Sequence, residues 1–125
     1  KLPNGVIWVA SDENIWNCIA ATDLALAYNS TVGLQAAAAG RPTISVRDVR
    51  FLKPDFFVNA GLFHDAQGIE PLAHLLDRFM AGHLAPRPGA SEVLRRHVGL
   101  LDGKASLRLT AVIRSIALSG RTAKF

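Results

Sequence analysis

The chain has a single cysteine, Cys18, among its 125 residues. One cysteine cannot form a disulfide within the chain or make up a cysteine metal site, so disulfide-stabilised domains and zinc fingers are excluded. No apolar run approaches the roughly 18 residues that a membrane-spanning helix needs. The first residues also lack the pattern of a secretory signal peptide. Because half of the residues are apolar, we expect a folded domain with a hydrophobic core.

Most sequence motifs of catalysis and cofactor binding are also missing. The chain contains no G-x-G-x-x-G fingerprint, no phosphate-binding loop with its lysine, no G-x-S-x-G turn and no H-E-x-x-H helix. Its four histidines are scattered without metal-ligand spacing: His64, His74, His83 and His97. His64-Asp65 offers acid–base chemistry, but it equally fits a solvated polar loop. We therefore expect no catalytic residue, no metal ion and no cofactor, and a chain that binds a ligand.

Charge is distributed unevenly along the chain. Residues 1–85 carry a net charge of −2 and residues 86–125 a net charge of +6. A basic C-terminal third predicts an anionic partner, such as a membrane surface contacted through residues 87–124, although a solvated helical surface fits as well. No aromatic residues interleave with these charges, which argues against a nucleic-acid partner.

Strand and helix patterns alternate along the first part of the chain. Three short apolar runs predict buried strands of a parallel sheet: Gly5–Ala10, Leu24–Tyr28 and Thr43–Val46. Helical spacing separates these runs at residues 15–20 and 31–39, and Gly40 ends the second helix. This order is typical of right-handed crossovers between parallel strands. We predict an α/β, Rossmann-like fold with a parallel sheet of about three to four strands, flanking helices and a final helical segment.

The remaining residues predict a long connection followed by helices. Residues 47–68 are irregular apart from a candidate fourth strand at Phe56–Val58, and long loops in compact domains are often functional. Arg47 and Arg50 follow the third strand, at the edge where open α/β sheets bind ligands, so they either contact phosphate or are solvated. Helical spacing recurs at residues 69–80, 91–101 and 106–118. In the last helix we expect four apolar residues to face inward: Leu109, Val112, Ile113 and Ile116.

The most informative motif lies where the second strand meets the second helix. It reads Asn29-Ser30-Thr31-Val32-Gly33-Leu34-Gln35. A helix N-terminus offers unpaired N–H donors to an anion, and the Ser30 and Thr31 hydroxyls add donors. Gly33 would let a ligand approach the backbone closely. The same residue types are also ordinary helix caps, so the motif indicates either a phosphate site or a capped core helix.

Residues 21–46 resemble the C-terminal donor-binding half of bacterial capsule polysaccharide biosynthesis proteins. These are GT-B-type glycosyltransferases and include transferases that use CMP-activated Kdo. Their pattern is an aspartate, an apolar strand, Ser-Thr-x-Gly-x-Glu, small residues, Gly-Lys-Pro and a further strand. Here it becomes Asp23, Leu24–Tyr28, Ser30 to Gln35, Ala36–Ala39 and Gly40-Arg41-Pro42. The good match covers residues 5–46, about a third of the chain.

The resemblance implies that Ser30, Thr31 and Gly33 hold the donor phosphate. From their positions in the chain, we expect Asn29 and Arg47 to line the same donor site. Gln35 stands where the family has a glutamate that contacts the donor sugar or ribose. The implied ligand is a CMP- or UDP-linked sugar, and the implied acceptor is a lipid-linked glycan. The general base belongs to an acceptor domain that this sequence does not contain, so the chain is expected to be inactive alone. The family implies a cytoplasmic protein, peripheral at the inner membrane.

The break at Pro86-Arg87-Pro88-Gly89 and the change in charge divide the chain into residues 1–85, a Rossmann-like nucleotide-sugar-binding part, and residues 86–125, basic helices that we expect to pack on it. Two other functions stay open. One is a sugar-nucleotide isomerase like UDP-N-acetylglucosamine 2-epimerase, whose equivalent junction has a double glycine and paired glutamates that this chain lacks. The other is a non-catalytic basic α/β module that binds a membrane or a partner.

Overall fold

The computed structural model describes Gly5, Arg50 and residues 12–28, 30–48, 56–100 and 102–119. The chain divides into two compact units, Lys1–Ala90 and Ser91–Phe125. The first unit contains the sheet and the helices around it. The second contains the C-terminal helices.

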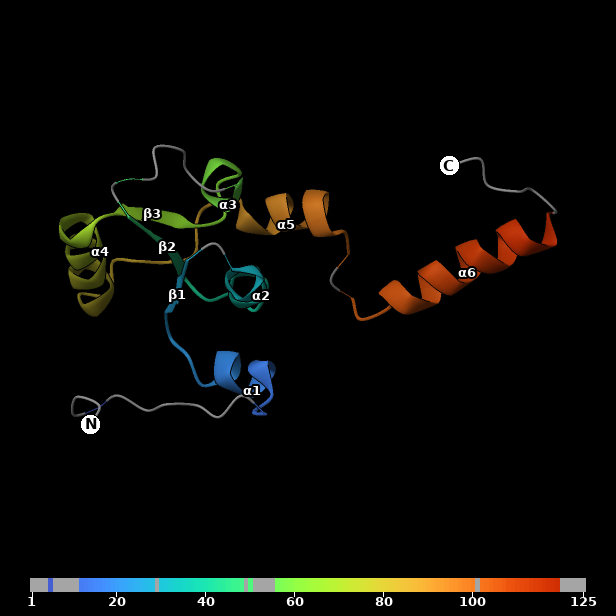
Figure 1. Cartoon of the computed structure of the whole chain (residues 1–125), viewed down its shortest axis with the longest axis horizontal. Coiled ribbons are helices and arrows are strands. Elements are labelled where there is room, and N and C mark those ends of the chain that lie inside the picture. The colour runs from blue at the N-terminus through green and yellow to red at the C-terminus, as the bar shows by residue number, and fades with distance from the viewer. Residues whose placement is uncertain are drawn as a thin grey trace. The chain divides into compact units, whose positions relative to one another are not determined.

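The first unit is built on a three-stranded parallel sheet (Figure 1). Its strands are β1 (Ala25–Ala27), β2 (Thr43–Arg47) and β3 (His64–Gln67), in the order β1-β2-β3. Leu26 is paired with Ile44, and Val46 with Ala66. The predicted α/β class and parallel sheet are therefore confirmed. The predicted strand at Gly5–Ala10 lies largely outside the described residues.

In the part of this unit that the structure describes, four helices accompany the sheet: α1 (Ile15–Ala20), α2 (Thr31–Ala38), α3 (Phe56–Asn59) and α4 (Ile69–Met80). Figure 1 shows α2 and α4 on opposite sides of the strands. The α4 side contains a core of Ile44, Ala66, Leu75 and Leu84. On the other side, α2 contacts β1 and β2. The sheet is thus covered on both faces, as parallel sheets require.

Strand β2 alternates between apolar and polar residues although both of its faces are buried. Ile44 is fully buried on the α4 side. Thr43, Ser45 and Arg47 point to the other face, and each is at most 6% exposed. Buried polar groups need hydrogen-bond partners. The polar side chains of β2 therefore need hydrogen-bond partners from the neighbouring elements.

The segment between β2 and β3 corrects one prediction. Phe56–Val58 is not a strand but the start of the short helix α3. After it, the Leu62 N–H donates to the Phe57 carbonyl at 2.8 Å, and the Phe57 and Phe63 rings lie 5.0 Å apart. The aromatic residues thus fold back on each other as a compact turn. The strand that completes the sheet is β3, in residues that the sequence indicated as a loop.

The second unit contains α6 (Ala105–Leu118) and most of α5 (Ala90–Val98). The sequence predicted both helices. It also predicted that Leu109, Val112, Ile113 and Ile116 face inward, which is wrong for the second unit taken by itself, because every residue of α6 is exposed there. The helical period is as predicted, but the described residues of the second unit do not cover its apolar side.

Candidate functional site

A cavity of about 850 Å³ opens at the carboxyl ends of the three strands. Tyr28 follows β1, while Val46 and Arg47 end β2 and Asp48 follows it. The other lining residues are Arg50, Gln67 and the first turn of α4, Gly68 to Leu72. Open parallel sheets bind ligands at this edge. The cavity is thus in the expected place for a binding site, and its size suits a small-molecule ligand.

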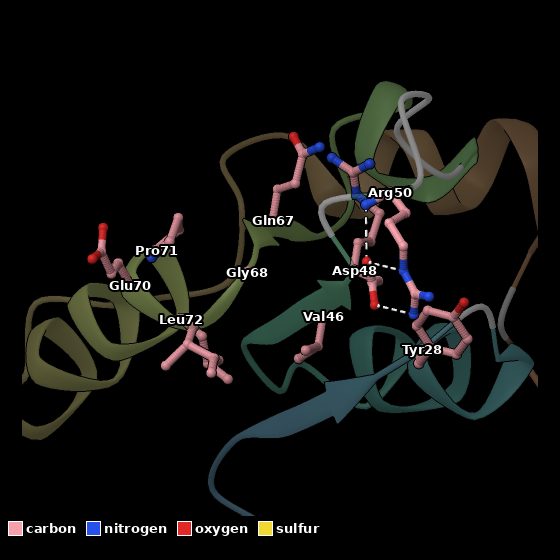
Figure 2. Close-up of a pocket in the computed structure, with 11 residues that line it drawn as sticks. Tyr28, Val46, Asp48, Arg50, Gln67, Gly68, Glu70, Pro71 and Leu72 are labelled. Carbon is pink, nitrogen blue, oxygen red and sulfur yellow. Dashed lines mark hydrogen bonds and ion pairs between the residues drawn. The ribbon is translucent and has the colours of Figure 1, made fainter.

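Arg50 and Asp48 form an ion pair on one side of the cavity (Figure 2). The Arg50 Nε donates to Asp48 Oδ1 at 2.9 Å, and Nη2 donates to Oδ2 at 2.7 Å. This guanidinium lowers the pKa of the Asp48 carboxyl. The Arg50 side chain is 83% exposed. Because an exposed ion pair is worth little, a ligand anion can compete with Asp48 for Arg50 at small cost.

Arg47 is the buried cation of the site. Its Nε and Nη2 donate to the two carboxylate oxygens of Asp65 at 2.8 and 2.6 Å. Asp65 is paired in register with Ser45 on β2, so its side chain lies on the same sheet face as Arg47. The Arg47 side chain is 6% exposed and that of Asp65 33% exposed. The bidentate pair fixes the guanidinium at the cavity wall.

The N-terminus of α4 forms another part of the wall. Its N-cap is Gly68, with φ of 97°, a conformation that favours glycine. The Gly68 N–H donates to the Arg47 carbonyl at 2.9 Å, which joins this turn to β2. Gly68 has no side chain to cap the helix, so first-turn N–H groups are left for water or a ligand. Glu70 places a carboxylate in the same turn.

Ser30 and Thr31 lie near the same edge of the sheet but do not line the cavity. Ser30 is the N-cap of α2, and its Oγ accepts the Val32 N–H at 3.2 Å. Thr31 is exposed in the first helical turn, and Gln35 is half-buried one turn later. Asn29 lies outside the described residues. Of the predicted donor-site residues that the structure describes, Arg47 alone lines the cavity, together with Arg50, which the sequence also placed at this edge of the sheet.

Gly33 has a packing role in the structure. It is buried, and its N–H donates to the Ser30 carbonyl at 3.2 Å. A Cβ added there would lie 2.8 Å from the Ala27 Cβ and 2.9 Å from the Phe63 ring. The missing side chain therefore lets α2 approach β1 closely. The space beside Gly33 that the sequence assigned to a ligand is occupied by Ala27 and Phe63.

His64 and Asp65 are separated by the strand that carries them. The sequence predicted both residues in a loop, which is wrong, because they lie on β3. Successive side chains of a strand point to opposite faces of the sheet. His64 begins the strand, away from the cavity edge, with Nε2 2.9 Å from the Ala85 carbonyl oxygen. Burial lowers its pKa and favours the neutral ring. The described residues contain no group of three or more metal-ligating side chains.

Sequence reasoning missed several cavity residues, among them Tyr28, Asp48 and Gln67. Their positions do carry a signal, since each ends a strand or directly follows one. Gly68 and Pro71 carry another, because Gly at an N-cap and Pro in the first turn are typical helix-start residues. Without a predicted strand at His64–Gln67, these residues could not be assigned to the edge of the sheet.

Comparison with known proteins gives no relative. No protein family model, no curated protein and no solved structure matches the chain. Among the described residues, no helix combines the length and apolar character needed to cross a membrane.

Proposed function

We propose that the chain binds the nucleotide-sugar donor of a glycosyltransferase. The observation that carries the proposal is the cavity at the carboxyl edge of the parallel sheet, with two arginines in its wall. The donor class comes from the resemblance of residues 21–46 to capsule polysaccharide biosynthesis proteins.

The cavity wall offers a separate surface to each part of such a donor. Arg50, bonded to a carboxylate that a phosphate can replace, supplies a cation for the diphosphate or monophosphate link. The uncapped first turn of α4 supplies backbone N–H donors. Val46, Leu72 and the half-exposed Tyr28 ring supply apolar surface for a base or sugar face.

The opposing charges in the wall limit how strongly an anion is held. Asp48 and Glu70 balance Arg47 and Arg50, so the lining as a whole is close to neutral. Arg47 is already bonded to Asp65. We therefore expect weak binding, and we assign phosphate contact to Arg50 and a positioning role to Arg47. No side chain is assigned to the transfer step.

Ligand-observed NMR on the full chain with CMP, UDP, GDP and ADP tests the proposal. Saturation transfer to one nucleotide above the others is expected, with CMP pointing to a Kdo-type donor and UDP to the epimerase-like alternative. Arg50→Gln should weaken that binding by about tenfold or more, since charge-assisted hydrogen bonds contribute roughly 1.5–3 kcal/mol.

Arg95→Gln is the matched control. Arg95 is also exposed and also forms a fork with a nearby carboxylate, that of Glu92, but it does not line the cavity. This variant should bind like the unsubstituted chain. The proposal is overturned if no nucleotide binds, or if Arg50→Gln and Arg95→Gln weaken binding equally. Loss on Ser30→Ala alone would move the site to the α2 N-terminus.

A further inference from the structure

Helix α6 displays an apolar stripe that the other described residues of the second unit leave exposed. The stripe consists of Leu109, Val112, Ile113 and Ile116, at the three- and four-residue spacing of one helix face. Their exposed fractions run from 44% to 61%. Large apolar side chains gathered on one exposed face mark an interaction site more often than scattered ones do.

The charges of α6 indicate what the stripe contacts. Arg108 and Arg114 are its only charged residues, and Lys104 directly precedes it at the N-cap. The helix therefore contains no carboxylate. Asp102 accepts two hydrogen bonds from Arg108, at 2.8 Å each. The acidic residue thus lies before the helix and pairs with Arg108, but this ion pair is exposed and worth little. Arg108 can therefore exchange Asp102 for another anion beside the apolar stripe.

We propose that α6 binds the surface of an anionic membrane, with its stripe at the headgroup–acyl boundary. The combination of an apolar face and cations is what such interfacial helices use. Arg108 lies at the border of the stripe, where it can reach lipid phosphate, and Arg114 adds positive charge from the far side. The fourteen residues of α6 suffice to lie along a surface, while they are too few to cross the bilayer.

A second copy of the chain is a poorer occupant of the stripe. Two α6 helices would bring like charges together without an acidic residue on either helix to pair with them. A contact of about two heptads is also short for a stable helix pair in water. Self-association is therefore an outcome that the experiment must separate from membrane binding.

Vesicle flotation of the full chain tests the proposal. Vesicles of phosphatidylcholine with one-quarter phosphatidylglycerol should bind the chain, and pure phosphatidylcholine vesicles should bind it far less. Binding to the mixed vesicles should weaken as salt is raised. Arg108→Gln should reduce binding by about fivefold, the effect of roughly 1 kcal/mol for a cation near the surface. Arg114→Gln, on the far side of the helix, should reduce it less.

Two leucines of α6 provide a matched pair of variants. Leu109 and Leu107 are 61% and 67% exposed, but they lie roughly 200° apart around the helix. Leu109→Ser should reduce binding to the mixed vesicles by about tenfold, while Leu107→Ser should change it little. Because neither side chain is buried, both variants should keep the helix content that circular dichroism measures for the unsubstituted chain.

Three results would overturn the proposal. The first is equal binding to both kinds of vesicle or to neither. The second is an equal effect of Leu107→Ser and Leu109→Ser. The third is a doubled mass in sedimentation that Leu109→Ser abolishes, which would identify a second copy as the occupant. The nucleotide experiment uses a different unit of the chain, so either proposal can fail without the other.

Discussion

Strand β2 and helix α6 show how differently one kind of residue is used in the two units. Ile44 at the centre of β2 is 0% exposed, whereas Ile113 on α6 is 57% exposed. Both elements have a regular apolar pattern, and both patterns were recognised in the sequence. Among the described residues of its own unit, β2 has neighbours on both sides, whereas α6 has none on its apolar side. An apolar pattern thus predicts which face will be covered, but not whether this chain covers it.

Truncating the two isoleucines should give the largest contrast in stability. Ile44→Ala should lower the free energy of unfolding by about 2–5 kcal/mol, because it removes buried methylene groups and leaves a cavity. Ile113→Ala should change it by less than about 0.5 kcal/mol, as for most exposed positions. Urea unfolding of the full chain measures both. Similar losses of stability would mean that Ile113 is packed in solution, and would contradict the contrast between a buried β2 and an exposed α6.

Removing Asp65 should have the next largest effect. Asp65→Ala takes away the carboxylate that accepts two hydrogen bonds from Arg47, whose side chain is 6% exposed. Breaking a fully buried pair costs roughly 3–5 kcal/mol, and partial exposure of Asp65 reduces our expectation to about 2–3 kcal/mol. Arg47→Met should cost about half as much, because water can solvate the remaining carboxylate. Equal costs in thermal unfolding would contradict this asymmetry.

Alanine at Gly33 should have a smaller effect, with an informative sign. At an exposed helix position, Gly→Ala stabilises by about 1 kcal/mol. Here the new Cβ meets Ala27 and Phe63 closer than 3.0 Å, so we expect a loss of about 1–3 kcal/mol from overpacking. The double variant Gly33→Ala with Ala27→Gly should recover part of that loss. Stabilisation by Gly33→Ala alone would show that α2 has room to move from β1.

The sequence predicted the elements whose local signals agree with their packing. Helix α4 begins and ends where its apolar spacing indicated, at Ile69 and Met80. Helix α2 begins after a Ser30 cap, and Gly40, with φ of 75°, follows its end. Residues of this kind carry their conformational preference with them, so single-sequence reasoning finds them.

The elements that were missed are determined by contacts distant in sequence. Strand β3 reads His64-Asp65-Ala66-Gln67, with Ala66 as its only apolar residue. Its conformation comes from pairing with β2, and its polar residues are tolerated because Asp65 bonds to Arg47. Phe56–Val58 shows the reverse case, an apolar run with strand-forming residues that becomes a helical turn. At both positions, tertiary contacts rather than local residue preferences determine the backbone conformation.

The candidate site was only partly predictable for the same reason. Arg47 and Arg50 follow a recognised strand, and the rule about sheet edges pointed to both. Gly68 and Glu70 could not be assigned to that edge while β3 was unrecognised. Ser30 was identified correctly as a polar residue at a helix start, yet its hydroxyl is bonded within α2. A cap and an anion site have the same sequence pattern.

The alternation in β2 also protects the chain against mispairing. A shift of one residue would turn Arg47 and Ser45 toward Ala66 and Leu75 and bring Ile44 to the polar face. Arg47 would then lose Asp65 and enter an apolar layer without its counter-charge. A strand apolar on both faces would tolerate such a slip far better. The buried polar residues therefore make the alignment of the sheet unambiguous during folding, at the strand whose end forms the cavity.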